Sequence, residues 1–327
     1  IGEKRAVAAL AVATMIICAV GVFIDIAVIT VAPIALAIGE RAGLSKSGIL
    51  LAMIGGGKAG NIVSPNPNTI AVTEAFQLDL TAVMLKNLIP AICALIATIV
   101  LASLLAKQTG DGISQNDLEA APAEKLPNAL QAFAGPLTVI VLLALRPLAK
   151  ISVDPLIALP LGGLVCILVT GNIRNLIPYT DFGLSKVIGV AILLIGTGTI
   201  AGIIKASALQ KDMTTLLSAM NMPAFILAPL SGILMAAATA STTAGSTVAS
   251  QTFSGTLLAA GVPALSAAAM IHAGATVLDS LPHGSFFHAT GGSVYMDIKN
   301  RMKLIPFEAL IGLTSTIVAV ILYLVTA

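Results

Sequence analysis

Long apolar runs fill most of the chain, and two short polar stretches break them. The first break, residues 60–69, reads GNIVSPNPNT. Pro65 and Pro67 each remove a backbone donor and disfavour helix just before them. The Ser, Asn and Thr side chains around them prefer to bond nearby backbone. We therefore expect residues 47–80 to form one helix that is interrupted inside an apolar segment.

A second break of the same kind lies far along the chain, at residues 279–288 (DSLPHGSFFH). An offset of 217 residues lays Pro65 on Pro282, and four further short matches follow in order at nearly the same offset. Single matches of this kind carry little weight, but an ordered series does. We expect segment 6–106 to be repeated as segment 223–327.

Composition places these runs in a membrane. Hydrophobic residues make up 57% of the chain and charged residues 10%, whereas a soluble domain carries about 25% charged residues. The pattern predicts an all-α polytopic membrane protein. The net charge is only +2 and the basic residues are scattered over loops, so no nucleic-acid partner is expected. The three cysteines lie far apart inside apolar runs, and we expect no metal and no cofactor.

The segments predict two inverted repeats joined by a linker. Residues 1–106 form the end of the first repeat, 107–128 a cytoplasmic linker, and 129–327 the second repeat. The expected elements are re-entrant hairpins over 6–38 and 223–262, broken helices over 47–80 and 264–296, scaffold spans over 130–146, 153–170 and 187–204, and closing spans over 88–106 and 304–326.

Each repeat would cross the membrane an odd number of times, so the two would insert in opposite orientations. A cytoplasmic linker leaves most Lys and Arg residues in inside loops, as the positive-inside rule requires. The first repeat lacks counterparts of the three scaffold spans. From the repeat offset we expect that about 108 residues of the first repeat are missing before Ile1, in a parent of about 435 residues.

With both breaks and both hairpins identified, the chain resembles the gluconate permease (GntP-type) family of the ion transporter superfamily. Three stretches carry the resemblance: 60–76 (GNIVSPNPNTIAVTEAF), 239–250 (TASTTAGSTVAS) and 279–287 (DSLPHGSFF). It implies a multi-pass inner-membrane protein that imports a small hydroxy-carboxylate such as gluconate, coupled to protons, by an elevator mechanism. The partners implied are the carboxylate, the coupling ion and the lipid bilayer, and a homodimer is one alternative for the oligomeric state.

The first break departs from the family pattern at one position. Gluconate-handling members tend to carry a histidine where this chain has Asn66. The amino-acid sequence of the break is also similar to the Ser-Asn-Thr signatures of sodium-coupled dicarboxylate relatives. A sodium-coupled dicarboxylate or citrate symporter is therefore the alternative function.

The polar side chains of the first break are the leading candidates for substrate or ion contacts. They are Ser64, Asn66, Asn68 and Thr69. Broken helices at membrane depth commonly form such sites, although a kink packed on its neighbours is the alternative. Gly60 is expected to let the backbone approach a ligand. Lys58 needs an anionic partner, either a side chain or the substrate, unless it snorkels to the surface, because an unpaired ammonium at depth costs about 2.5–3.5 kcal/mol.

Two acids inside apolar segments, Asp25 and Asp279, are the candidates for the coupling ion. Burial raises the proton affinity of a carboxyl group, which suits a proton carrier, while either acid could instead bond backbone amides as a permanent anion. Asp279 is favoured because it begins the second break. A sodium site formed by Ser64, Asn66 and Thr69 is the alternative.

The second hairpin and the second break supply the remaining candidates. The hydroxyl-rich hairpin tip, residues 239–250, contains three residues that are expected either to contact substrate or to pack between helices. They are Thr242, Thr243 and Ser246. His283 is expected to bond substrate hydroxyls, with Gly284 beside it. His283 and His288 are five residues apart, a poor spacing for a metal site on one helix face.

Two other classes of function were weighed against transport. An intramembrane enzyme would need a nucleophile motif, and the chain contains no Gly-x-Ser-x-Gly. A channel can use broken helices, but selectivity rings normally come from oligomeric symmetry. We therefore expect a transporter and not an enzyme.

Overall fold

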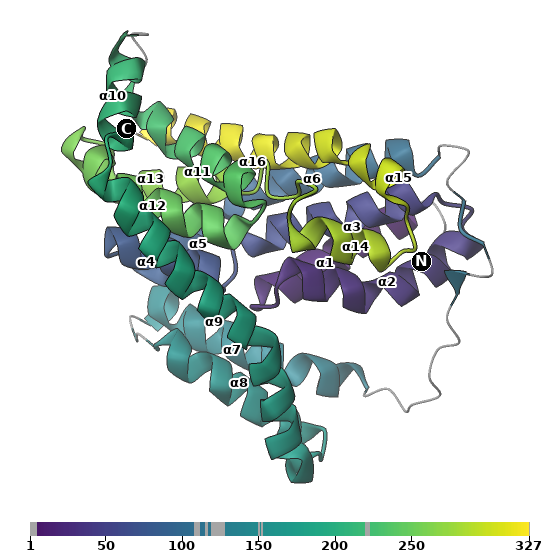
Figure 1. Ribbon diagram of the computed structural model, residues 1–327. Coiled ribbons are helices and arrows are strands. Elements are labelled where there is room, and N and C mark those ends of the chain that lie inside the picture. The colour runs from purple at the N-terminus through teal and green to yellow at the C-terminus, as the bar shows by residue number, and fades with distance from the viewer. Residues whose placement is uncertain are drawn as a thin grey trace. The chain divides into compact units, whose positions relative to one another are not determined.

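The chain folds into helices, and the computed structural model groups them into two units (Figure 1). The described residues are 5–107, 112–114, 117–118, 128–149, 151, 153–219 and 223–326. Unit 1 comprises residues 1–120 and 197–327, and unit 2 comprises 121–196. Apart from one isolated bridge between Ser45 and Gly112, every regular element in these residues is helical, which confirms the all-α prediction.

Six helices lie within the described residues of the amino-terminal part of unit 1. They are α1 (Ala6–Ala19), α2 (Ile24–Arg41), α3 (Lys46–Asn61), α4 (Pro67–Phe76), α5 (Leu80–Lys86) and α6 (Leu88–Leu105). Side-chain caps fix three of the starts, since Ser45, Asn66 and Asp79 each accept bonds from first-turn amides. The first two helices form a packed pair with a short turn between them.

The carboxy-terminal part of unit 1 follows a similar order. Its elements are α10 (Leu209–Ala219), η4 (Ala224–Ile226), α11 (Leu227–Thr239), α12 (Thr242–Ala259), α13 (Ala264–Gly274), α14 (Ser285–Gly292), α15 (Ile298–Met302) and α16 (Ile305–Thr326). Helices α11 and α12 form the second packed pair.

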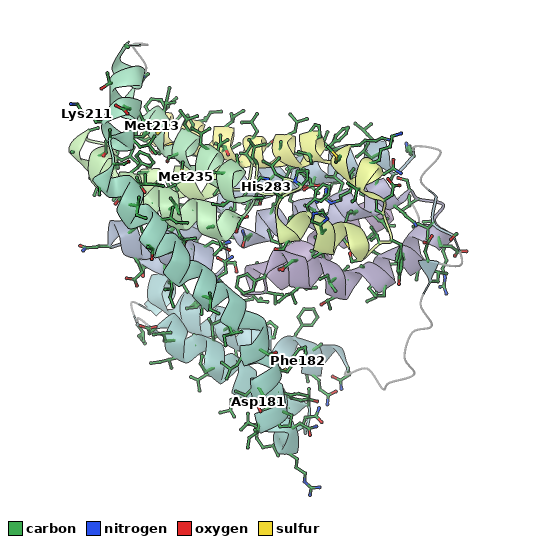
Figure 2. The ribbon with its side chains drawn as sticks, in the orientation of Figure 1. Asp181, Phe182, Lys211, Met213, Met235 and His283 are labelled. Carbon is green, nitrogen blue, oxygen red and sulfur yellow. The ribbon has the colours of Figure 1, made fainter. Side chains whose placement is uncertain are left out.

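Unit 2 consists of α7 (Ala129–Ala149), α8 (Pro155–Val169), the short η3 (Ile173–Asn175) and the start of α9 (Leu176–Ala206). Helices α7 and α8 approach closely at two glycines: a Cβ on Gly135 would lie 2.9 Å from the carbonyl oxygen of Gly162. The prediction for the third scaffold span began at residue 187, but the helix starts at Leu176. Its first turns carry polar residues such as Asp181, which is labelled in Figure 2 and is exposed.

Glycines let backbones touch inside unit 1. A Cβ on Gly60 would lie 2.3 Å from the carbonyl oxygen of Met15 in α1, and one on Gly274 would lie 2.5 Å from that of Pro229 in α11. Small residues at helix contacts are the usual way to pack membrane helices. The expectation that Gly60 admits a ligand was therefore wrong, because the backbone it meets belongs to α1.

Helices from the two parts of unit 1 pack against each other. Helix α12 of the second part packs on α4 of the first, and α14 packs on α2. Helices α6 and α16 lie side by side and antiparallel (Figure 1). The end of α6 lies at Ser45, whose neighbour Lys46 bonds the carbonyl of Tyr295 just before α15 and α16. Neither part therefore packs only on itself.

The breaks differ in detail from their predicted bounds. The hydroxyl-rich tip predicted at 239–250 is only a two-residue turn, because Ala240 adopts a left-handed conformation and Ser241 caps α12. The following threonines and serines are helical, and Thr247 bonds the carbonyl of Thr243. The second helix break runs over residues 275–284, so the residues from Ser285 to His288 also belong to a helix.

Among the described residues, two helical segments are long and apolar enough to cross a membrane: Leu88–Leu105, and Ile298–Thr326, which joins α15 and α16. Several shorter apolar helices accompany them. Most of the predicted linker 107–128 lies outside the described residues. Within it, Asp117 forms an ion pair with Lys46 at 2.7 Å.

Candidate functional site

The first break is a compact capped turn. Asn66 Oδ1 accepts bonds from the amides of Asn68 (3.0 Å) and Thr69 (3.1 Å), and Pro67 occupies the first helical position, where its missing donor costs nothing. The amino end of α4 is thereby fixed. The side-chain carbonyl of Asn66 is thus engaged in this cap.

Three asparagines interlock behind this cap. Asn61 Oδ1 accepts bonds from both Asn66 Nδ2 and Asn68 Nδ2, the latter at 3.0 Å, and Asn66 Nδ2 also bonds the backbone carbonyl of Asn61 at 2.9 Å. Thr69 donates to the carbonyl of Ser64 at 2.7 Å. Asn61 was not among the predicted site residues, although it lies three residues after Lys58 and hence on the same helix face.

Polar atoms remain unpaired in this cluster. Asn61 Nδ2, Ser64 Oγ and Asn68 Oδ1 are buried and have no hydrogen-bond partner among the described residues. An unsatisfied buried polar group costs about 1–3 kcal/mol, so each of these three atoms would gain from a hydrogen-bonding partner. One free donor, one free acceptor and one hydroxyl that can act as either are gathered here.

A buried ion pair joins the two breaks. Lys58 Nζ lies 2.5 Å from Asp279 Oδ1 and donates to the carbonyl of Thr276 at 2.7 Å. The side chains of Lys58 and Asp279 are 1% and 3% exposed. The anion partner of Lys58 is therefore a side chain, and the ammonium does not reach the surface.

The second hairpin completes the coordination of Asp279. Thr242, in the first turn of α12, donates to Asp279 Oδ2 at 2.6 Å, and Ser280 donates to Oδ1 at 2.9 Å. Both carboxylate oxygens are thus bonded. Asp279 was expected to be a buried acid that either carries a proton or bonds backbone amides; in the structure its partners are a cation and two hydroxyls.

Other predicted residues lie near these groups without bonding to them. Thr243 and Ser246 are buried in α12, and Ser246 bonds the carbonyl of Thr243 at 3.2 Å. Gly284 packs on the α11–α12 turn, where a Cβ would lie 2.6 Å from the carbonyl oxygen of Ala240. Its small size serves this contact.

The histidines and Asp25 stand apart from the cluster. His283, labelled in Figure 2, is exposed. His288 Nε2 lies 2.8 Å from the carbonyl of Pro282 and closes the break. Asp25 is half-buried in the first turn of α2 beside Ile24, whose side chain lies against Gly57 near the end of α3. No hydrogen bond joins Asp25 to Asp279 among the described residues.

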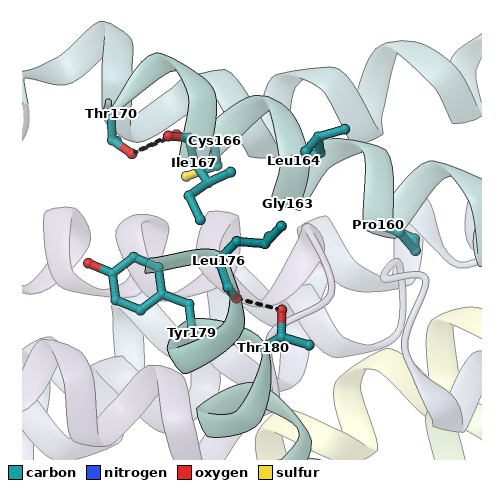
Figure 3. Close-up of a pocket in the computed structure, with 9 residues that line it drawn as sticks. All are labelled: Pro160, Gly163, Leu164, Cys166, Ile167, Thr170, Leu176, Tyr179 and Thr180. Carbon is teal, nitrogen blue, oxygen red and sulfur yellow. Dashed lines mark hydrogen bonds between the residues drawn. The ribbon is translucent and has the colours of Figure 1, made fainter. Parts of the chain in front are cut away.

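Unit 2 carries an apolar pocket of about 550 Å³ between α8 and the start of α9 (Figure 3). Two of its lining hydroxyls are engaged by their own helices, Thr170 with the carbonyl of Cys166 and Thr180 with that of Leu176, both at 2.8 Å. Neither hydroxyl is therefore free to bond a ligand without losing its helix bond.

Comparison with known proteins agrees with this arrangement. Residues 1–159 match the family described as GntP family permease. A protein of Haemophilus influenzae named "Uncharacterized transporter" is 57% identical over 323 residues, covering 99% of this chain and 77% of the relative. The chain belongs to the GntP permease family, and it is a membrane transporter of a small molecule and not an enzyme.

Proposed function

We propose that this permease imports a small hydroxy-carboxylate such as gluconate, coupled to protons, as a multi-pass protein of the inner membrane. The observation that carries the proposal is the set of unpaired buried atoms at the first break, on Asn61, Ser64 and Asn68. Asn61 lies three residues after Lys58 in α3, and Asn68 lies in the first turn of α4. Transporter sites are typically built from such broken helices.

The chemistry of the three atoms favours a substrate with hydroxyls. Asn61 Nδ2 can donate to a carboxylate or hydroxyl oxygen, but Asn68 Oδ1 needs a donor. A fully ionised dicarboxylate offers only acceptors, whereas a hydroxy acid offers both. Asn68 Oδ1 and Ser64 Oγ could also bind a sodium ion through oxygen. A sodium-coupled dicarboxylate or citrate symporter is therefore the second candidate.

Proton coupling is assigned to Asp279. It is the buried acid bonded to groups from both breaks and from the second hairpin, through Lys58, Ser280 and Thr242. A group at such a junction can change its proton affinity when the surrounding elements rearrange. Asp25, half-buried and outside this junction, is the weaker candidate.

The exchanged contacts within unit 1 support two inverted repeats and an elevator motion. The pairs α12–α4 and α2–α14 correspond under the repeat offset, and so do α6 and α16, which run antiparallel. The hairpin helices α2 and α12 pack on the helices α14 and α4 that follow the breaks, so hairpins and breaks could move as one body. A homodimer would supply a fixed scaffold for that motion.

Uptake by the purified full-length protein in proteoliposomes tests the proposal. Labelled gluconate should accumulate under an inward proton gradient without sodium. Accumulation of citrate or a dicarboxylate that requires a sodium gradient would favour the second candidate. Ser64→Ala should lose uptake, whereas Ser231→Ala should not, because the Ser231 hydroxyl is equally buried but bonded to the carbonyl of Ala228 in its own helix.

Cysteine labelling tests the inverted topology. In a cysteine-free background, a cysteine within residues 107–128 should be shielded from impermeant thiol reagents in intact cells. Lys86→Cys, predicted to lie on the outer side, should react. The opposite pattern would overturn the orientation proposed for both repeats.

A further inference from the structure

The Lys58–Asp279 pair is the charged centre at the junction of the two breaks. It is buried, it is electrically neutral as a pair, and it links the last turn of α3 to the second break. Lys58 holds a second bond to the carbonyl of Thr276, which is independent of Asp279. The ammonium would therefore stay in place if Asp279 released it.

Among the described residues, Lys58 is the cation that pairs with Asp279. Helices α6, α11 and α12 contain no Asp, Glu, Lys, Arg or His. The other elements that pack around the two breaks carry the following titratable groups. They are Cys18 of α1, Asp25, Glu40 and Arg41 of α2, Lys46 of α3, Glu74 of α4, His272 of α13, His283 of the break, His288 of α14, and Glu308 and Tyr323 of α16. Glu308 is already paired with Arg301.

A substrate carboxylate therefore meets a charge problem. Adding an anion to a buried neutral pair leaves one uncompensated negative charge, which is strongly unfavourable away from water. If Asp279 takes up a proton, the carboxylate becomes a neutral acid and Lys58 regains a full positive charge to offer. One proton and one monoanion then enter together, and the site remains neutral.

We infer that the substrate carboxylate and Asp279 compete for the Lys58 ammonium, so that substrate binds there only as Asp279 becomes protonated. This inference rests on the proposed function and specifies its coupling step. No covalent bond changes: the proton adds to an Asp279 oxygen, and the substrate carboxylate takes the place of that oxygen at Lys58 Nζ. Thr242 and Ser280 can retain the neutral acid, since a hydroxyl both donates and accepts.

Linkage gives the inference a measurable form. If binding takes up one proton, the dissociation constant for gluconate rises about tenfold per pH unit at pH values where Asp279 is ionised in the free protein. Purified protein should take up one proton for each gluconate bound, measurable with a pH indicator in weak buffer. A pair with only a structural role predicts neither effect.

The decisive variant is Asp279→Asn, which mimics the protonated acid. Its dissociation constant for labelled gluconate should be independent of pH, and at mildly alkaline pH it should be lower than that of the wild type. Binding to this variant should take up no proton. Binding that is weaker by the same factor at every pH, or that keeps the wild-type pH slope, would overturn the inference.

A neutral double variant and a matched control complete the test. Lys58→Met with Asp279→Asn avoids leaving a buried charge unpaired, and it should fold but lose gluconate binding. Arg301→Met with Glu308→Gln neutralises the other buried ion pair and should leave the pH slope intact. Gluconate binding by the first double variant at wild-type affinity would overturn the role of Lys58.

Different results would overturn the proposed substrate class and the competition at Lys58. A wild-type protein that binds no gluconate overturns the proposed substrate class and this inference together. A wild type that binds gluconate with proton uptake, beside an Asp279→Asn variant that also takes up a proton, overturns only the competition at Lys58.

Discussion

The two helix breaks occupy corresponding places in unit 1 but differ in length and chemistry. The first, between Asn61 and Pro67, is short, is shaped by prolines and is capped by Asn66. The second spans residues 275–284, has no side-chain cap at Gly284, and is closed by backbone turns. The first holds unpaired amide and hydroxyl atoms, whereas the second holds a fully bonded carboxylate.

The difference indicates a division of labour. The first break has unpaired polar atoms that a ligand could bond, whereas both carboxylate oxygens of Asp279 at the second break are already bonded. Lys58 connects them, because it belongs to the helix of the first break and bonds the second. Under the proposed function, the first break would contact the ligand and the second would carry the charge.

The largest effect should follow from Lys58→Ala. This change leaves Asp279 buried without its cation, which costs about 3–5 kcal/mol, so the variant should unfold at a much lower temperature in a detergent melting assay. Adding Asp279→Asn should restore most of the loss, since the buried charge is gone. If Lys58→Ala alone melts like the wild type, the pair does not hold the breaks together.

Asn68→Ala should have a large effect on transport and little on folding. Its side chain has an unpaired oxygen and one bond to Asn61, so truncation removes a ligand contact and relieves an unsatisfied atom. We expect gluconate affinity to fall about 10- to 100-fold, as for a lost hydrogen bond of 1.4–3 kcal/mol. Equilibrium binding and thermal melting of the same sample distinguish the two effects.

Asn66→Ala should lower the stability of the protein as well as its gluconate binding. It removes the cap of α4, which costs about 1 kcal/mol of stability, and it frees Asn61 to rearrange. Binding should weaken because the site loses its shape, and the melting temperature should fall as well. A variant that loses binding at unchanged melting temperature would show that Asn66 contacts the ligand directly.

The smallest effect should come from the ion pair at the start of α3, far along the helix from the first break. Lys46, at the start of α3, pairs with Asp117 and also bonds the carbonyl of Tyr295. Its hydrogen bond is the main cause that lowers the pKa of Asp117 below the ordinary value. The stabilisation is therefore present above the ordinary pKa of an aspartate and is lost as pH falls through the lowered one.

Asp117→Asn should accordingly cost under about 1 kcal/mol at neutral pH, and the cost should vanish in acid. Thermal melting as a function of pH measures this difference. A cost that persists below the lowered pKa would assign the effect to the bonds between Asp117 and Ser114 instead of the ion pair.

The sequence could reveal the breaks because their cause is local. Prolines that stand among several short polar side chains strongly disfavour helix, so the interruptions near Pro65 and Pro282 could be located without a structure. A proline without such neighbours, such as Pro33, can lie inside a helix. The hydroxyl-rich segment after Ala240 misled us for the opposite reason. Serines and threonines in a helix can bond their own backbone, as Thr247 does, so a run of them does not mark a turn.

The partners of the charged groups could not be read from the sequence. Lys58 and Asp279 are separated by 221 positions, and only the folded arrangement brings them together. The same holds for Asn61, whose importance comes from the two asparagines it meets. Long-range pairing depends on packing between helices, which local patterns do not specify.

The exchanged contacts between α4 and α12, and between α2 and α14, also bear on how the protein is made. Synthesis proceeds from the amino end, so α2, α4 and Lys58 enter the membrane well before the segments that cover and neutralise them. The first half must wait, incompletely packed and with a buried cation unpaired, until residues beyond 279 emerge. Completion of the chain is then itself the step that stabilises its beginning, and interrupted translation would leave a product ready for proteolysis.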